Sequence, residues 1–178
     1  MKKNFNEIIK PVIVLVCICL VVTALLAYIN SVTSPIIAKA EQEKTRQAMS
    51  DVLCEADGFE KLEIGNLPER VTQAYSATNG VGYVFMLTTK GYGGEMKLIC
   101  GMDADGVIEQ CKTLSHAETS GLGSKTAEDP YRNQYCKKSA DTLSEVDAIT
   151  GATISSSAYK NAIEDAFKAY DMVKEAGK

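Results

Sequence analysis

The chain lacks the residue sets that usually mark a metal centre or a catalytic triad. His116 is the only histidine among 178 residues, and no Cys-x-x-Cys pair occurs. One histidine without cysteine or carboxylate at ligand spacing does not make a zinc site. It also has no recognisable nucleophile and orienting acid to complete a triad. We therefore predict no metal site and no catalytic residue.

Basic residues are also scarce. The chain has 19 Lys and Arg against 23 Asp and Glu, a formal net charge of −4. The first 30 residues carry a net +2, so the remainder carries −6. Binding to the phosphates of nucleic acids needs clustered Lys and Arg. The composition therefore argues against a nucleic-acid partner.

The glycine-rich stretch Gly91-Tyr92-Gly93-Gly94 lacks the features of a nucleotide-binding loop. It does not end in Gly-Lys-Ser/Thr, which a P-loop requires, and no helical pattern follows it. The simplest interpretation of this stretch is a tight turn.

Charged residues are absent from a run of 18 positions, Val12 to Ile29. As a helix with a rise of ~1.5 Å per residue it would span about 27 Å, close to the ~30 Å hydrocarbon core of a bilayer. A cleaved signal peptide has a shorter apolar region of about 7–15 residues and a small-x-small site, which residues 30–35 do not offer. We therefore expect residues 12–29 to be a transmembrane helix. Because an ion pathway normally needs polar or ionisable groups in the membrane, such a pathway would lie outside this chain.

The lysines predict the orientation of this helix. Lys2, Lys3 and Lys10 precede the run, and the next basic residue is Lys39. Positive residues flank the cytoplasmic side of membrane helices. The sequence thus predicts a single-pass protein of the cell (inner) membrane, with residues 1–11 in the cytoplasm and the C-terminal domain outside it.

The rest of the chain predicts an α+β domain. Ser34-Pro35 suggests a break, and the stretch from Ile36 to Leu53 reads as a solvated helix, so residues 30–55 are expected to form a helical stalk. Residues 56–178 would form the domain, a curved antiparallel sheet with packed helices. Alternating apolar residues and turn signals predict four strands. These are Val71–Ala77, Val81–Thr89, Met96–Met102 and Val107–Leu114.

The six cysteines give a weaker signal. Cys17 and Cys19 lie in the apolar run and read as small apolar residues. Cys100 and Cys111 flank the predicted hairpin turn at residues 103–106, which could bring them near each other. A disulfide does not follow from the sequence alone.

The most informative motif is Asp147-Ala148-Ile149-Thr150-Gly151-Ala152-Thr153. A helical pattern starts at Ile154, after an irregular and polar segment at 118–140. Free N–H groups and the helix dipole make a helix N-terminus a favourable place for a phosphate, and Gly151 permits a tight turn. Thr153 would present its oxygen there. The simpler interpretation is that the hydroxyl residues cap the helix.

This motif resembles the flavinylation motif of the FMN-binding domain family. In that family the last threonine carries FMN through a phosphoester bond, which here is Thr153. The loop His116-Ala117-Glu118-Thr119-Ser120-Gly121-Leu122-Gly123 fits the same family. The family usually has Pro at the place of Ser120 and often Ser at that of Thr150, and neither difference removes a functional group. With the membrane helix, the whole chain resembles the G subunits of Rnf electron-transport complexes, which are relatives of the C subunit of the sodium-pumping NADH:quinone oxidoreductase.

The resemblance implies a set of residues around the flavin. FMN would be covalently bound to Thr153, and the other residues of the motif and the loop would line its pocket. The implied neighbours are Tyr92, His116, Glu118, Thr119, Gly121, Leu122, Gly123, Lys125, Asp147, Thr150, Gly151 and Ala152. A separate flavin transferase would make the bond from FAD with Mg²⁺.

The function that the resemblance implies is electron transfer. The chain would be an electron-carrier subunit, not catalytic alone, of a ferredoxin:NAD⁺ oxidoreductase complex that couples electron flow to ion translocation. Its partners would be the other Rnf subunits. Two alternatives remain at this point: a stand-alone membrane-anchored flavoprotein reductase, and a non-redox binding module in which Thr153 is a simple helix cap.

Overall fold

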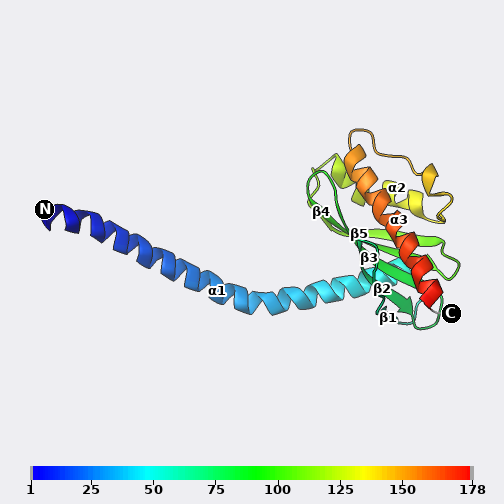
Figure 1. Cartoon of the computed structure of the whole chain (residues 1–178), viewed down its shortest axis with the longest axis horizontal. Coiled ribbons are helices and arrows are strands. Elements are labelled where there is room, and N and C mark those ends of the chain that lie inside the picture. Colours follow the sequence, from blue (N-terminus) through cyan, green and yellow to red (C-terminus); the bar gives the residue numbers. More distant parts are fainter. Residues whose placement is uncertain (1, 177–178) are drawn as a thin grey trace. The chain divides into compact units, whose positions relative to one another are not determined.

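The computed structural model describes residues 2–176, and the side chains of residues 9–175. The chain divides into two compact units, residues 1–44 and 45–178. The first is most of helix α1 (Lys2–Val52), and the second holds the last turns of α1, a sheet and the remaining helices. Figure 1 shows the order of these elements along the chain.

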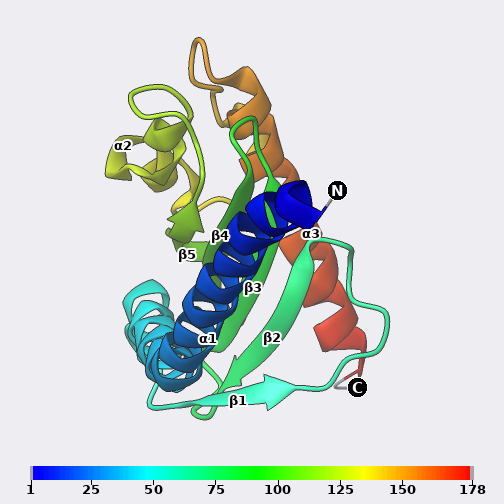
Figure 2. The ribbon, with the colours of Figure 1, turned by 90° about the vertical axis from the view of Figure 1, so that its left-hand side faces the viewer.

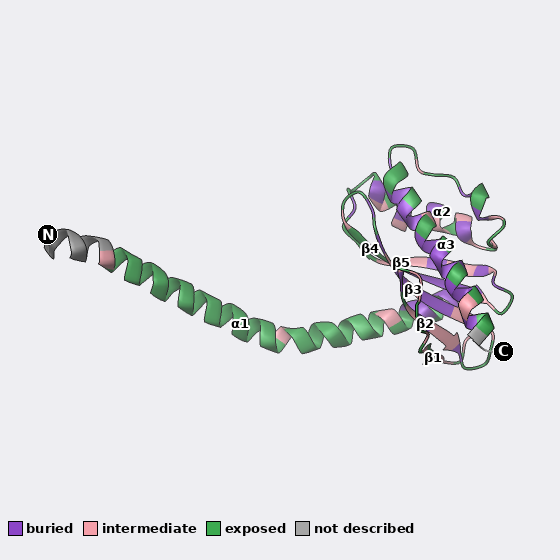
Figure 3. Cartoon of the chain, in the orientation of Figure 1, coloured by how far each residue is buried: buried purple, intermediate pink, exposed green. Residues whose placement is uncertain are grey.

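Helix α1 contains the predicted apolar run. It is the one helix in the described residues that is long and apolar enough to cross a membrane. Its large apolar side chains, such as Leu20 and Leu26, are exposed (Figure 3). The expected break at Ser34-Pro35 is wrong, because the helix continues through both Pro11 and Pro35. A proline removes one backbone hydrogen bond, and favourable turns on both sides can carry the helix past it.

The sheet is a five-stranded antiparallel meander with the order β1-β2-β3-β4-β5. The strands are β1 (Phe59–Leu62), β2 (Val71–Ala77), β3 (Gly82–Lys90), β4 (Glu95–Asp103) and β5 (Ile108–His116). The α+β class and four of these strands are as predicted. Strand β1 was missed because it has only four residues, with two charged ones in the middle, and therefore shows no apolar alternation.

Helix α3 (Thr153–Ala176) covers one face of the sheet (Figures 1 and 2). The predicted alternation in β4 places Met96, Leu98, Cys100 and Met102 on this face, all fully buried. The helix presents mainly small and aromatic residues to them. These are Ala158, Tyr159, Ala162, Ile163, Ala166, Phe167, Ala169, Tyr170 and Val173.

The last turns of α1 cover the opposite face. Ala48, Met49 and Val52 form a second buried cluster with Val84 and Ile99 of the sheet. This part of the expected stalk is therefore not solvated. The apolar residues here are too few for a helical stripe to be evident in the sequence, yet they are enough to fill the space over β3 and β4.

The segment between β5 and α3 holds four short helical turns, where the sequence suggested only irregular, polar structure. They are η1 (Gly123–Ala127), α2 (Asp129–Arg132), η2 (Asn133–Tyr135) and η3 (Leu143–Glu145). Tyr131 and Tyr135 of this segment are buried, and their hydroxyl oxygens lie 2.9 Å apart. The Tyr131 hydroxyl also donates to the Ser156 carbonyl at 3.2 Å. This contact fastens the segment under the first turns of α3.

The close approach of α1 to β4 depends on Gly101. A Cβ at this position would lie 2.3 Å from the Val52 carbonyl oxygen. We predict that Gly101→Ala lowers the free energy of unfolding by about 1–3 kcal/mol, because the helix end must move away from the sheet. Chemical denaturation of the full chain in detergent measures this. Gly65→Ala is the matched control, since its Cβ would meet nothing within 4 Å. Equal stability of the two variants would contradict the prediction.

Candidate functional site

Helix α3 starts without a side-chain cap. The Ser156 N–H donates to the Ala152 carbonyl at 2.9 Å, so Ala152 is the N-cap residue and Thr153 the first residue of the helix. The alanine side chain has no oxygen that could accept a hydrogen bond from the free N–H groups. Thr153 is exposed, and its hydroxyl makes no hydrogen bond to the described residues. The capping interpretation of Thr153 is therefore not supported.

The turn before the helix is held by its own backbone and by one serine. Gly151 has a φ of +82°, which glycine adopts without strain. The Ala152 N–H donates to the Ile149 carbonyl at 2.9 Å. The Ile149 N–H in turn donates to Ser156 Oγ at 3.0 Å. These bonds fix the path of the chain immediately before Thr153.

A cleft of about 450 Å³ opens on one side of Thr153. It lies between the start of α3, the β3–β4 turn and the loop that follows β5. Its lining residues are Tyr92, Glu118, Thr119, Leu122, Gly123, Gly151, Ala152, Thr153, Ile154 and Ser155. The volume falls in the usual range of about 300–1,000 Å³ for small-molecule sites.

Three large apolar side chains at this cleft are exposed. Tyr92 is 74% exposed, Leu122 48% and Ile154 59%. Each comes from a different segment, and burying such residues from water is favourable. Tyr92 lies in the β3–β4 turn, which is closed by the Gly91 N–H donating to the Gly94 carbonyl at 2.9 Å. The cleft therefore offers apolar and aromatic surface to a planar ligand.

One buried carboxylate, that of Glu118, joins the three segments. Its Oε2 accepts from Ser155 Oγ at 2.7 Å, and its Oε1 accepts from the Gly93 N–H at 3.2 Å. Glu118 is 9% exposed. The Glu118 N–H donates to His116 Nδ1 at 3.3 Å, so the imidazole supports the loop from outside the cleft.

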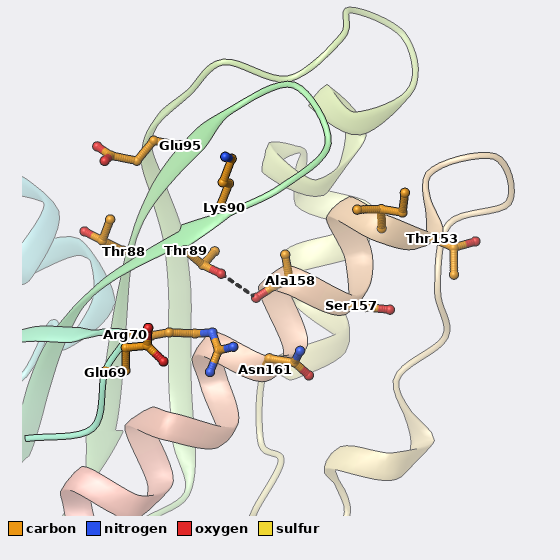
Figure 4. Close-up of a pocket in the computed structure, with 11 residues that line it drawn as sticks. Glu69, Arg70, Thr88, Thr89, Lys90, Glu95, Thr153, Ser157, Ala158 and Asn161 are labelled. Carbon is orange, nitrogen blue, oxygen red and sulfur yellow. Dashed lines mark hydrogen bonds between the residues drawn. The ribbon is translucent and has the colours of Figure 1, made fainter.

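A second, larger cleft of about 830 Å³ lies between the first turns of α3, the end of β3, the start of β4 and the two residues that precede β2. Figure 4 shows Arg70 and Lys90 among the residues that line this cleft. Thr153 and Ile154 line both clefts, so Thr153 stands between them. Thr89 links β3 to α3, because its hydroxyl donates to the Ala158 carbonyl at 3.2 Å.

Ion pairs hold the guanidinium group at this second cleft. Arg70 Nη1 lies 2.9 Å from Asp165 Oδ2, and Lys168 Nζ lies 2.7 Å from Asp165 Oδ1. Burial acts to raise the pKa of Asp165, but the hydrogen bonds from Lys168 and Arg70 outweigh it and the pKa is lowered. Arg70 is therefore engaged with the protein.

The first cleft brings together most of the residues named from the sequence. Tyr92, Glu118, Thr119, Leu122, Gly123, Gly151, Ala152 and Thr153 all line it. Five others do not line either of these two clefts. They are His116, Gly121, Lys125, Asp147 and Thr150. Asp147, Thr150 and Lys125 lie exposed on the surface nearby.

Two lining residues were missed. Ile154 and Ser155 follow the motif directly, and their place in the first turn of a helix that starts at Thr153 is the signal that could have found them. Nothing in the sequence marks Arg70, Lys90 or Asn161, because only the packing of α3 on β2 and β3 gathers these separate residues.

Two family models of known proteins match the chain. A family model for the FMN-binding domain matches residues 91–168, and one for the RnfG N-terminal region matches residues 1–52. The G subunit of the ion-translocating oxidoreductase complex of Methanosarcina acetivorans is 32% identical over 90% of this chain and 93% of its own length. The chain belongs to the RnfG family.

Other members of the RnfG family match over similar lengths. The G subunit of the Na(+)-translocating ferredoxin:NAD(+) oxidoreductase complex of Acetobacterium woodii is 31% identical over 94% of this chain and 93% of its own length. The G subunit of the proton-translocating ferredoxin:NAD(+) oxidoreductase complex of Clostridium ljungdahlii is 29% identical over 92% of each. Every residue that lines the first cleft lies within the FMN-binding domain match.

Proposed function

We propose that this chain is an electron-carrier subunit of a membrane-bound ferredoxin:NAD⁺ oxidoreductase complex that couples electron transfer to ion translocation, and that it carries FMN covalently on Thr153. The observation that carries the proposal is the Thr153 hydroxyl. It is exposed, has no partner among the described residues, and stands at the first turn of α3 beside a cleft of the FMN-binding domain.

The start of α3 suits a phosphate ester. The N–H groups of the first turn have no acceptor within the helix, and the Ala152 side chain cannot supply one. A phosphate on Thr153 would accept from such groups and would lie at the positive end of the helix dipole. The missing side-chain cap is thus explained if the cofactor provides the cap.

The first cleft suits the flavin ring better than the second. Exposed Tyr92, Leu122 and Ile154 offer the aromatic and aliphatic surface that a planar ring system needs. The second cleft is lined instead by charged groups such as Glu69, Arg70 and Lys90. Bound FMN would supply the redox chemistry, while the protein holds and orients it.

Attachment by a separate flavin transferase fits the surroundings of Thr153. Thr153 Oγ1 would bond to the phosphorus of the FMN half of FAD, the phosphoanhydride bond would break, and AMP would leave. The hydroxyl proton needs a base, and the nearby Glu118 carboxylate is already engaged with Ser155. A base from the transferase fits better. Asp147 and Thr150 are exposed, so an enzyme that recognises the motif could reach them.

The partners follow from the names of the relatives. Proteins similar over more than nine tenths of their length are named as subunits of ferredoxin:NAD(+) oxidoreductase complexes. We therefore expect the other Rnf subunits to be the partners. A stand-alone flavoprotein reductase would lack a neighbouring set of genes for multi-span membrane subunits, and a non-redox module would be colourless when purified.

If FMN is covalently bound to Thr153, removal of this hydroxyl should abolish covalent flavin. Protein purified from cells that contain the transferase should stay yellow after denaturation and show the added mass of one FMN. Thr153→Ala should abolish both, because the acceptor hydroxyl is gone, whereas Ser157→Ala should keep both. Ser157 is the matched control, since it is an exposed hydroxyl residue one turn later on α3. Flavin that remains on the denatured Thr153→Ala protein would contradict the assignment.

The lysines before the apolar run support an orientation with the FMN-binding domain outside the cytoplasm. A protease added to intact spheroplasts should then degrade residues 45–178 and leave a tag placed before Met1 protected. Mass spectrometry and a tag-specific antibody measure the two parts separately. Degradation of the tag with protection of the domain would reverse the orientation.

A further inference from the structure

The Glu118 carboxylate is buried, and electron transfer by a flavin does not by itself require such a group. Its two oxygens reach two different segments, Ser155 on α3 and Gly93 in the β3–β4 turn. Thr153, which would carry the cofactor, is two residues from Ser155. Tyr92, the exposed aromatic residue of the cleft, is next to Gly93. One side chain therefore links the two segments that face each other across the cleft.

Glycines make room for this carboxylate. A Cβ on Gly91 would lie 1.9 Å from Glu118 Oε1, and a Cβ on Gly123 would lie 2.1 Å from Oε2. By contrast, a Cβ on Gly121 would meet nothing within 4 Å. Gly91 and Gly123 thus leave the space that the Glu118 carboxylate occupies. This gives the glycine-rich turn and the loop one shared structural cause.

We propose that Glu118 is a positioning residue that sets the first turn of α3 against the β3–β4 turn, and that its charge lowers the reduction potential of the flavin. The proposal rests on the proposed function. The carboxylate is among the groups that line the cleft. Electrostatic interactions are stronger in a site shielded from water, and a nearby negative charge opposes the addition of an electron.

The experiment compares Glu118→Gln and Glu118→Ala with the wild type in the full chain, produced together with the transferase. Glu118→Gln keeps the shape and an acceptor oxygen, so the flavinylated fraction should stay near that of the wild type while the midpoint potential of the flavin becomes more positive. Glu118→Ala removes both bonds, and its flavinylated fraction should fall several-fold. Glu60→Gln is the matched control and should change neither quantity, because Glu60 is an exposed carboxylate on β1 that lines neither cleft.

The outcomes separate the two proposals. Wild-type protein without covalent flavin would overturn the proposed function itself. A flavinylated wild type, with Glu118→Gln at an unchanged potential and Glu118→Ala modified as fully as the wild type, would overturn the role of Glu118 alone. If Glu118→Ala does not fold, the potential of Glu118→Gln decides.

A second inference concerns Cys100 and Cys111 and does not depend on the flavin. These residues are directly opposite each other on β4 and β5, and their sulfur atoms lie 3.4 Å apart. Opposite residues of antiparallel strands have Cα atoms about 4.5–5.5 Å apart, within the range of about 4.4–6.8 Å that disulfides span. Both side chains are at most 1% exposed.

The structure assigns Cys100 and Cys111 as a pair that forms a cross-strand disulfide. A disulfide oxidant, such as oxidised glutathione, would accept the two electrons in two thiol–disulfide exchange steps: each thiol loses its proton, the S–S bond forms, and two reduced thiols leave. Exchange needs a thiolate, and burial and the neighbouring Cys100 thiol raise the pKa of Cys111 in the folded domain. The pair would therefore oxidise while the β4–β5 hairpin is still accessible, before α3 covers it.

The test is to refold the full chain in detergent in a glutathione redox buffer and then to block free thiols for peptide mapping. We expect a peptide that joins Cys100 to Cys111, while the exposed Cys54 is blocked. In Cys100→Ser, Cys111 should be blocked as well. Complete blocking of both residues in the wild type at every glutathione ratio would overturn the assignment.

Discussion

Burial of α3 against the sheet is the interaction that fixes the position of Thr153. The helix lies over β2 and β3 with closely packed alanines and with larger residues such as Tyr159 and Ile163, all hidden from water. Full burial of a large apolar side chain contributes roughly 1.5–3 kcal/mol. Small residues let the helix approach closely, and the bond from Thr89 to the Ala158 carbonyl sets its position along β3. Once the helix lies there, its first residue is beside the β3–β4 turn.

The remaining geometry of the site follows from local requirements around that position. The turn before α3 needs Gly151, because its φ is positive, and the helix has no side-chain cap, because Ala152 is the N-cap residue. Glu118 then links α3 to the glycine turn, and the glycines leave room for its oxygens. The result is a cleft with a buried, hydrogen-bonded carboxylate inside and exposed apolar side chains at its rim. In the proposed function, such a site would hold a flat cofactor with one edge open to a partner, as electron exchange between subunits requires.

Much of this was predictable because the signals are local. The apolar run, the alternation in β4 and the order of residues from Asp147 to Thr153 each need only a few neighbours to be recognised. The failures have a different cause. Strand β1 exists because β2 offers an edge, and the last turns of α1 are buried because Gly101 leaves space for Val52. His116 and Gly121 belong to the loop motif, yet the fold places neither at the cleft. Long-range packing decides these cases, and a single sequence does not reveal it.

In the proposed function, the membrane helix and the domain have different tasks, and the properties of each part fit its task. The apolar part of α1 carries no charge between Val12 and Ile29, so it can anchor the chain in a membrane and has no ionisable group to offer an ion. The domain, in turn, needs no acid or base of its own if the flavin performs the redox chemistry and another enzyme attaches it. A covalent tether has a clear purpose in that arrangement. If the domain lies outside the cytoplasm, as proposed, a dissociated flavin would not be replaced, whereas a phosphoester at the N-terminus of a buried helix would keep the cofactor beside its cleft while its exposed edge exchanges electrons.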